Sequence, residues 1–307
     1  MTESKTLAAV SDGLADAVER VAASVVTVGA RRRIPATGVA WRRDGLIVTA
    51  DHVIEREEDI RVRLPGAEEA VAAELVGRDP GTDLALLRVE AELTPAELTP
   101  EDGARIGQLV LAVGLAGATP EASLGVLSGV GGWSHQGHGG SHGGGSYLRS
   151  DVTMFPGFSG GPLVDAQGRV LGLNTSGFRH AGGITIPSAT VSEVVETLAQ
   201  HGRIRRAYLG IGSQVTRLPE AQTAKLQGDL AGLETGLLIV GIEDDSPAGA
   251  GGMLVGDILV GIEGSPLGRT EDLQEQLGSE RVGVAIDLTV LRGGEPAMLS
   301  VTPTERP

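Results

Sequence analysis

Ser159 lies between glycines in the segment Gly157-Phe158-Ser159-Gly160-Gly161, a setting that suits covalent chemistry. Glycines beside a hydroxyl let the backbone come close to a substrate. They also leave the N–H groups of Gly157 and Ser159 able to stabilise a developing oxyanion. A serine hydroxyl is a weak nucleophile at its own pKa, so it needs a neighbouring base and a group that orients this base.

A histidine that could act as the base and an aspartate that could orient it both occur upstream of Ser159. His52 closely follows the β-branched run 46–50, and Asp83 comes directly before the apolar run 84–87. The chain order His52, Asp83, Ser159 is that of chymotrypsin-type enzymes. In that arrangement the histidine accepts the serine proton, and the aspartate fixes the histidine tautomer and stabilises the imidazolium. The order therefore predicts a catalytic triad.

Each of these residues has an ordinary structural explanation when it is taken alone. A single histidine beside a strand usually serves the core or the surface, an aspartate after a threonine often belongs to a turn, and Gly-Gly-Pro often marks a loop. The motif Gly-x-Ser-x-Gly also occurs in α/β-hydrolases, where an acid and then a histidine follow the serine. Only His180 and His201 follow Ser159, which leaves little room for that order. The prediction depends on all three residues occurring together at strand ends.

Longer segments around these residues resemble the HtrA/Deg family of serine proteases. The resemblance runs from about Val25 to the C-terminus and is most specific around the three residues. It implies a mainly β fold, a chymotrypsin-like double β-barrel followed by a PDZ domain. The segments that carry it are Thr49-Ala50-Asp51-His52-Val53, Val76 to Ala85, Pro156 to Leu163, Leu171 to Thr175 and Gly183 to Ser188.

The chain is expected to divide into a helical segment at 1–23, a protease domain at 24–202 and a PDZ domain at 203–307. Apolar residues spaced three or four apart predict an amphipathic helix over 6–22. A second helix is expected to be capped at Ser188 and to end at Gly202. Further elements are a helix over 270–277, a hairpin around 293–294, and strands over 24–28, 38–41, 46–49, 60–64, 71–76, 108–113 and 124–129.

The composition limits the possible partners and the compartment. A net charge of −15 argues against nucleic acid and against an anionic membrane surface. The chain has no cysteine, so neither disulfides nor thiol chemistry is expected. The first residues lack the basic start and apolar centre of a signal peptide, and no run is long enough for a transmembrane helix. A cytoplasmic location is therefore expected, as are the absence of a cofactor and of a metal site.

Specificity is predicted from residues around the nucleophile. By their positions, Met154, Phe178 and Ile184 are expected to line the primary specificity pocket, which would then accept small or medium aliphatic side chains. The alternative is that they belong to the core. Asn174 and Thr175 are expected to lie on an edge strand that pairs with an extended, unfolded substrate.

Two positions bear on the family resemblance. Phe158 stands where the family usually has asparagine, and its side chain is expected to point away from the reacting carbonyl. Residues 131–146 are rich in glycine and histidine and are predicted to be mobile, with only adventitious metal binding at His135, His138 and His142. The resemblance implies that this stretch is the regulatory loop of the family.

The segment Tyr208-Leu209-Gly210-Ile211 resembles the carboxylate-binding loop of a PDZ domain. Consecutive N–H groups from Leu209 to Ile211 can form a nest for the terminal carboxylate of a peptide. An ordinary strand is the alternative for this tetrapeptide alone. The run 246–264 supports the PDZ interpretation, because it resembles the turn-rich part of that domain.

The leading hypothesis is a serine endopeptidase of protein quality control, with His52 as base, Asp83 as orienting group and Ser159 as nucleophile. The PDZ domain would capture peptide C-termini, and the resemblance implies that the N-terminal segment helps to build a homotrimer. A peptide-binding sensor or chaperone with weak or latent protease activity is the alternative from another class. An esterase would use the same three residues, but pairing with an extended substrate argues against it.

Overall fold

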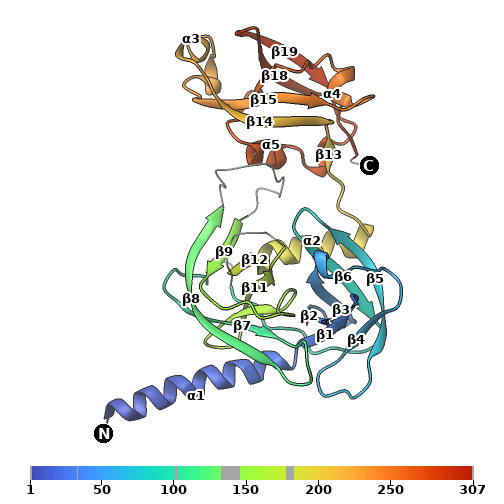
Figure 1. Ribbon diagram of the computed structural model, residues 1–307, viewed down its shortest axis with the longest axis vertical. Helices are drawn as coiled ribbons and strands as arrows, with labels where there is room; N and C mark the ends of the chain where they lie inside the picture. The colour runs from blue at the N-terminus through green and yellow to red at the C-terminus, as the bar shows by residue number, and fades with distance from the viewer. Residues whose placement is uncertain (1, 33, 101–102, 133–145, 178–182, 306–307) are drawn as a thin grey trace. The chain divides into compact units, whose positions relative to one another are not determined.

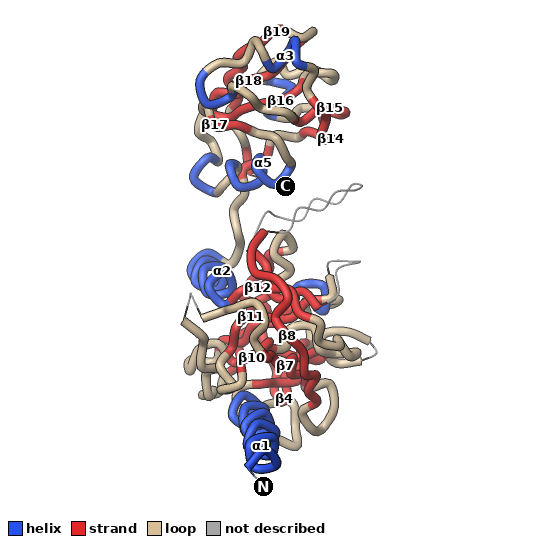
Figure 2. Tube along the Cα trace, turned by 90° about the vertical axis from the view of Figure 1, so that its left-hand side faces the viewer, coloured by secondary structure: helices blue, strands red, loops and turns tan. Residues whose placement is uncertain are grey.

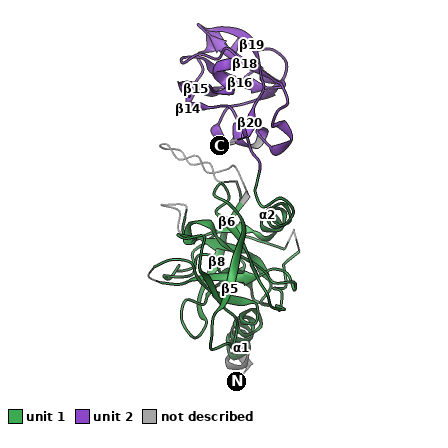
Figure 3. Ribbon diagram, turned by 90° about the vertical axis from the view of Figure 1, so that its right-hand side faces the viewer, with its two compact units in different colours: residues 1–133, 145–204 green, residues 134–144, 205–307 purple. Residues whose placement is uncertain are grey.

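The computed structural model describes residues 2–32, 34–100, 103–132, 146–177 and 183–305. They divide into two compact units, one up to residue 204 and one from residue 205 (Figure 3). The first unit holds two closed β-barrels and two helices, and the second holds a six-stranded sheet with short helices (Figure 1). The predicted mainly β fold with a double β-barrel is confirmed, and the second unit forms a sheet of its own where the PDZ domain is predicted.

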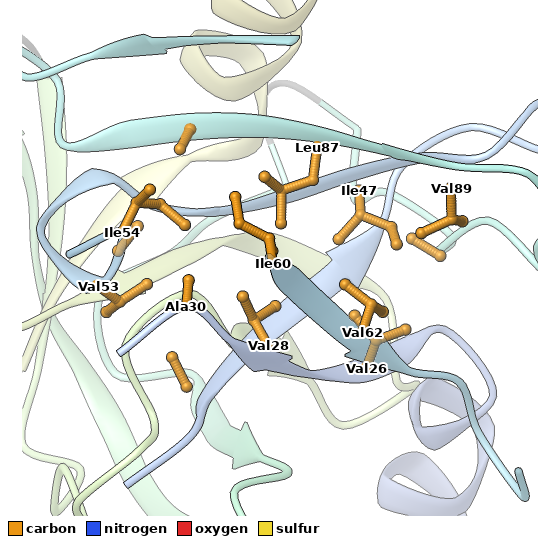
Figure 4. Close-up of a cluster of buried hydrophobic side chains, with 14 of the residues drawn as sticks. Val26, Val28, Ala30, Ile47, Val53, Ile54, Ile60, Val62, Leu87 and Val89 are labelled. Carbon is orange, nitrogen blue, oxygen red and sulfur yellow. The ribbon is translucent and has the colours of Figure 1, made fainter. Parts of the chain in front are cut away.

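The first barrel closes in the antiparallel order β1-β2-β3-β6-β5-β4. Its interior is filled mainly by valine, isoleucine, leucine and alanine side chains, among them Val26, Ile47, Ile60 and Leu87 (Figure 4). These β-branched and aliphatic residues suit a pleated, buried surface. The strands are β1 Val25–Gly29, β2 Ala36–Ala40, β3 Leu46–Ala50, β4 Ile60–Arg63, β5 Val71–Asp79 and β6 Leu84–Val89.

The second barrel closes in the order β10-β11-β12-β9-β8-β7. Phe158 is 1% exposed and packs in the core of this barrel, with an edge-to-face contact to Phe155. Its side chain therefore points away from the surface at Ser159, as expected from the sequence. The strands are β7 Leu109–Gly114, β8 Glu121–Gly132, β9 Ser146–Ser150, β10 Pro162–Asp165, β11 Val170–Thr175 and β12 Gly183–Pro187.

Two helices pack against the barrels from outside (Figure 2). Helix α1 (Thr2–Ala22) contacts β7 and β10, whereas α2 (Ser188–His201) lies against β5, β6, β11 and β12. Gly202 ends α2 in the left-handed conformation, with a φ of 70°, as the sequence predicts. The prediction that Ser188 caps this helix is wrong. Pro187 is the N-cap residue and makes no side-chain hydrogen bond, so Ser188 is already helical.

The second unit is built on the antiparallel sheet order β14-β15-β16-β18-β19, in which β14 is an edge strand. Two hydrogen bonds from Arg292 hold the pKa of the Asp257 carboxyl below its usual value, and the N–H of Leu254 adds to this effect. The strands are β13 Ala207–Tyr208, β14 Ile211–Arg217, β15 Thr235–Ile242, β16 Ile258–Ile262, β17 Ser265–Pro266, β18 Ile286–Arg292, β19 Glu295–Val301 and β20 Thr304–Glu305. The helices are α3 Glu220–Thr223, α4 Pro247–Ala250 and α5 Thr270–Gln276.

Candidate active site

His52 and Asp83 lie side by side in the first barrel. Asp83 precedes β6, and His52 is in the 3₁₀ turn Asp51–Val53 that follows β3, the neighbouring strand. The Nδ1 atom of His52 is 2.8 Å from Oδ2 and 3.0 Å from Oδ1 of Asp83. The backbone N–H of His52 also donates to Oδ1, at 2.9 Å. The carboxylate therefore fixes both the backbone and the ring of the histidine.

Asp83 adopts a backbone conformation that is unusual for a residue other than glycine. Its φ is 60°, in the left-handed region, which typically costs roughly 1–3 kcal/mol. The carbonyl of Asp83 accepts the N–H of Asp51 at 3.0 Å, so the 3₁₀ turn holds this conformation in place. Strain that is supported from outside in this way is common at functional sites.

The residue before His52 is fixed by an ion pair of its own. Asp51 accepts a hydrogen bond from the guanidinium of Arg78, which raises the pKa of Arg78 above its usual value. Arg78 also contacts Glu57 at 3.1 Å. The carboxylate of Asp51 is therefore paired with Arg78, and the carboxylate that contacts the His52 imidazole is that of Asp83.

Ser159 enters from the second barrel, in the turn that leads into β10. It is 6% exposed, and its Oγ lies 2.8 Å from Oγ of Ser176. The Oγ atom of Ser176 is in turn 3.4 Å from Nε2 of His52. The three residues singled out from the sequence are thus brought together, with the Ser176 hydroxyl beside them.

The turn before Ser159 presents backbone donors. Within the described residues, the N–H groups of Gly157 and Ser159 make no hydrogen bond, whereas that of Phe158, between them, donates to Phe155 O at 3.1 Å. The carbonyl of Gly157 is held at 2.7 Å by the hydroxyl of Thr37, from the first barrel. The two unused N–H groups can therefore receive an oxyanion.

Gly160 is required by close packing between the barrels. Its φ is 83°, and a Cβ at this position would lie 2.1 Å from the carbonyl oxygen of Thr37 and 2.3 Å from Oγ1 of Thr49. No other residue fits there without moving the strands. This contact explains why a glycine follows the serine.

A cavity of about 560 Å³ opens beside Ser159. Met154 lines it, together with Phe155 and the side chains of Arg31 and Arg32. The prediction that Ile184 lines the specificity pocket is wrong, because Ile184 is 1% exposed and packs in the core with Leu173 and Ile186. Phe178 lies outside the described residues, and so do His135, His138 and His142.

Asn174 and Thr175 do not lie on an edge strand. Their strand, β11, is paired with β10 on one side and with β12 on the other, so they cannot pair with a substrate through a free edge. The side chain of Asn174 is buried and bonds to Pro162 O and to Thr185. Thr175 donates instead to Oδ2 of Asp83. The prediction that these two residues form an edge for substrate is wrong.

The segment Tyr208-Leu209-Gly210-Ile211 connects β13 to β14. Gly210 has a φ of 74°, and a Cβ there would lie 2.3 Å from Cβ of Ser246. The carbonyls of Leu209 and Gly210 accept the N–H groups of Ala248 and Glu243, each at 2.9 Å. Their own N–H groups make no hydrogen bond among the residues that the structure describes. Helix α5 contacts β14, the edge strand.

Comparison with known proteins identifies one domain in each of the two units. Residues 36–173 match the trypsin-like peptidase domain, and residues 207–302 match the PDZ domain. A solved structure described as HtrA-type protease AlgW with tripeptide is 30% identical, with a TM-score of 0.78 over 96% of this chain and 97% of that chain. The chain is thus a trypsin-like serine peptidase domain joined to a PDZ domain. It belongs to the family of HtrA-type serine proteases.

Two curated relatives are similar over most of this chain. A probable periplasmic serine endoprotease DegP-like of Pseudomonas fulva is 31% identical over 86% of this chain and 54% of its own length. A putative serine protease HhoB of Synechocystis is 32% identical over 87% of this chain and 65% of its own length. The chain therefore spans about half to two thirds of the curated relatives that it matches.

The predicted cytoplasmic location is wrong. The relative from Pseudomonas fulva is named as periplasmic, and two further relatives have the same name. The prediction depended on the composition of the first residues, and these form helix α1 of the folded unit. Within the described residues, no helix is both long and apolar enough to cross a membrane.

Proposed function

We propose that this protein is a serine endopeptidase that hydrolyses peptide bonds of unfolded or damaged proteins, with His52, Asp83 and Ser159 as its catalytic residues. The observation that carries the proposal is a continuous series of contacts from the first barrel to the second. It runs from Asp83 to His52, from His52 to the hydroxyl of Ser176, and from Ser176 to the hydroxyl of Ser159. Family membership supports the same reaction.

In this reaction the proton of Ser159 passes to Nε2 of His52 while Oγ attacks the carbonyl carbon of the scissile bond. The carbonyl oxygen becomes an oxyanion, which the N–H groups of Gly157 and Ser159 stabilise. Asp83 stays ionised and holds the imidazolium through Nδ1. Met154 contributes to the pocket that receives the substrate side chain. Because the Met154 side chain is apolar, the pocket favours an aliphatic residue of the substrate.

The test is covalent labelling of the wild-type protein with a fluorophosphonate, followed by mass spectrometry of the digested protein. We expect a single modified residue, Ser159, because the label reacts with an activated serine and not with ordinary hydroxyls. Heat-denatured protein is the control and should remain unlabelled. Labelling at another serine, or none at all, would contradict the proposal and would favour a sensor or chaperone that only binds peptides.

We also propose that residues 203–307 act as a PDZ domain that binds peptide C-termini. The free N–H groups of Leu209 and Gly210 support a carboxylate site, together with the N–H of Ile211 and the hydroxyl-bearing Tyr208 beside them. The neighbouring edge strand β14 offers backbone groups to an extended peptide beside α5. Residues 24–202 would form the protease domain, and residues 1–23 its N-terminal helical segment.

A peptide titration tests the PDZ proposal. We expect a fluorescent peptide with a free C-terminal carboxylate to bind in an anisotropy measurement, and the same peptide with an amidated C-terminus to bind at least about tenfold more weakly, since a buried charge-assisted hydrogen bond contributes 1.5–3 kcal/mol in general. Equal binding of both peptides would contradict carboxylate recognition.

The assembly and the remaining partners are also proposals. An exposed apolar groove between α1 and the strands β7 and β8 supports a homotrimer, because Leu7, Val10 and Leu124 line it and are 73%, 46% and 51% exposed. The net charge of −15 supports the absence of nucleic acid and of anionic membrane surfaces among its partners.

A further inference from the structure

The segment 30–35, which connects β1 to β2, is tied to the turn that holds His52. Glu55 follows this turn by two residues, and its backbone N–H donates to Ala30 O at 3.2 Å. The Oε2 atom of Glu55 also accepts the backbone N–H of Arg32, at 3.4 Å. These contacts place the segment on the side of the site where His52 lies.

The same segment borders the turn of the oxyanion donors. A Cβ at position 157 would lie 3.0 Å from the carbonyl oxygen of Pro35, so the end of the segment passes close to Gly157. When a peptide bond is cleaved, the leaving nitrogen takes a proton from His52, so the residues after the bond lie on the His52 side of Ser159. The segment 30–35 therefore forms the wall of the cavity that faces these leaving-group residues.

This wall carries more positive than negative charge. The charged residues that line the cavity are Arg31, Arg32 and Glu55, two cations and one anion, although the net charge of the chain is −15. Among the residues that the structure describes, neither arginine side chain forms an ion pair with a carboxylate, because the Glu55 carboxylate contacts a backbone N–H instead. The wall therefore offers positive charge to a substrate.

The two arginines differ in what their guanidinium groups already bind. Arg31 donates from Nε to Ile34 O and from Nη2 to Pro35 O, the latter at 3.2 Å, so it holds its own segment in shape. The Arg32 side chain is exposed and makes no hydrogen bond within the described part of the chain, so its donors are available to a ligand. A guanidinium presents its N–H groups in a planar fork that matches both oxygens of a carboxylate.

We propose that Arg32 is a specificity-determining residue, which binds a carboxylate of the substrate on the leaving-group side of the cleaved bond. Arg31 shapes the segment and adds positive potential at the same place. An acidic side chain and the C-terminus of a short leaving segment both supply a carboxylate, and cleavage of matched peptides distinguishes them. The inference rests on the proposed endopeptidase function and extends it to the class of substrate.

The test measures kcat/KM for quenched fluorescent peptides that differ at one position after the cleaved bond, which mass spectrometry locates. Glutamate is compared with glutamine at the first, second and third of these positions, because the two side chains differ in charge but hardly in shape. We expect wild type to cleave the glutamate peptide about 3- to 5-fold faster at one position, the modest size of an exposed ion pair. Added salt should lower this ratio, because it screens exposed charges.

Three variants assign the preference to one side chain. Arg32→Gln should remove the preference for glutamate, and it keeps the backbone N–H that Glu55 accepts. Arg32→Glu should reverse the charge preference, so that a lysine peptide is cleaved faster than its glutamine partner. The matched control is Arg43→Gln, an exposed arginine of the β2–β3 connection that does not line the cavity, and it should keep the wild-type ratio.

Peptides that end at the second or third residue after the bond, with a free or an amidated C-terminus, identify the source of the carboxylate. Faster cleavage of the free acid, lost in Arg32→Gln, assigns the site to a terminal carboxylate, whereas a preference for internal glutamate assigns it to an acidic side chain. The proposal is overturned if wild type shows neither preference, or if the preference persists in Arg32→Gln. Absence of cleavage of every peptide would instead contradict the endopeptidase function itself.

Discussion

Replacing Ser159 with alanine is expected to lower kcat for cleavage of an unfolded protein by about 10⁶-fold, the size of effect seen when a serine protease loses its nucleophile. The reason is that Oγ of Ser159 is the atom that bonds to the substrate carbon, and alanine has no atom to replace it. The serine is buried, at 6% exposed, yet it borders the cavity beside Met154 and Phe155. Cleavage of casein, measured by the release of small peptides, gives the rate.

Stability is not expected to change much in this variant. Among the residues that the structure describes, the Ser159 side chain makes one hydrogen bond, to Ser176, and its loss leaves the backbone bond from Thr37 N–H to Ser159 O in place. Thermal unfolding should therefore resemble that of wild type, and binding of C-terminal peptides should be retained. Casein cleavage by Ser159→Ala at a rate near that of wild type would show that another residue is the nucleophile.

The same pair of proteins separates an endopeptidase from an esterase. An endopeptidase should cleave casein and should lose this activity with Ser159→Ala. An esterase should hydrolyse a simple ester and leave casein intact. Because β11 is paired on both sides, Asn174 and Thr175 give no reason against an esterase. Membership of the HtrA-type family is the finding that favours an endopeptidase.

Local patterns in the sequence predict most of the elements. Alternating and β-branched runs place β1 to β4 and β7 within a few residues of their observed bounds, since each strand pattern depends on nearby residues. The order His52, Asp83, Ser159 suffices to predict which residues meet, because each follows or precedes a strand. Gly202 ends α2 for a local reason too, its left-handed conformation.

Contacts between distant segments could not be predicted in this way. Thr175 bonds to Asp83 across 92 residues of sequence, and Thr37 bonds to Gly157 across 120. Nothing near Thr175 in the sequence shows that its hydroxyl faces the carboxylate. The edge-strand error has the same origin, because the pairing of β11 with β10 and β12 is a property of barrel closure. The sequence therefore does not predict that Ser176 lies beside the nucleophile.

Replacing Asp83 with asparagine is expected to lower kcat by about 10⁴-fold while the fold is retained. The carboxylate of Asp83 accepts hydrogen bonds from the N–H of His52, from Nδ1 of His52 and from the Thr175 hydroxyl. An asparagine side chain has one oxygen and one NH₂ group, so it cannot accept all three. Because the His52 backbone N–H bonds to Oδ1, the asparagine oxygen takes that place, and the NH₂ group takes the place of Oδ2, where it faces Nδ1 and requires it to be an acceptor.

The neutral imidazole would then carry its proton on Nε2, which could no longer accept a proton from the Ser159 side. The ring nitrogens can be observed directly by ¹⁵N NMR of labelled histidine, and we expect the resonances of His52 to exchange their protonated and unprotonated positions between wild type and Asp83→Asn. The loss of kcat and the change of tautomer should occur together, because an imidazole with its proton on Nε2 cannot accept the serine proton there.

Asp51→Asn is the matched control, because Asp51 is also buried and lies next to His52 in the chain. Asp51 bonds to Arg78 rather than to the imidazole, so its replacement should lower thermal stability and leave the His52 tautomer as in wild type. A large loss of kcat in Asp51→Asn with little loss in Asp83→Asn would reverse the roles of the two carboxylates. Equal losses without a change of tautomer would show that Asp83 acts on folding rather than on the orientation of the base.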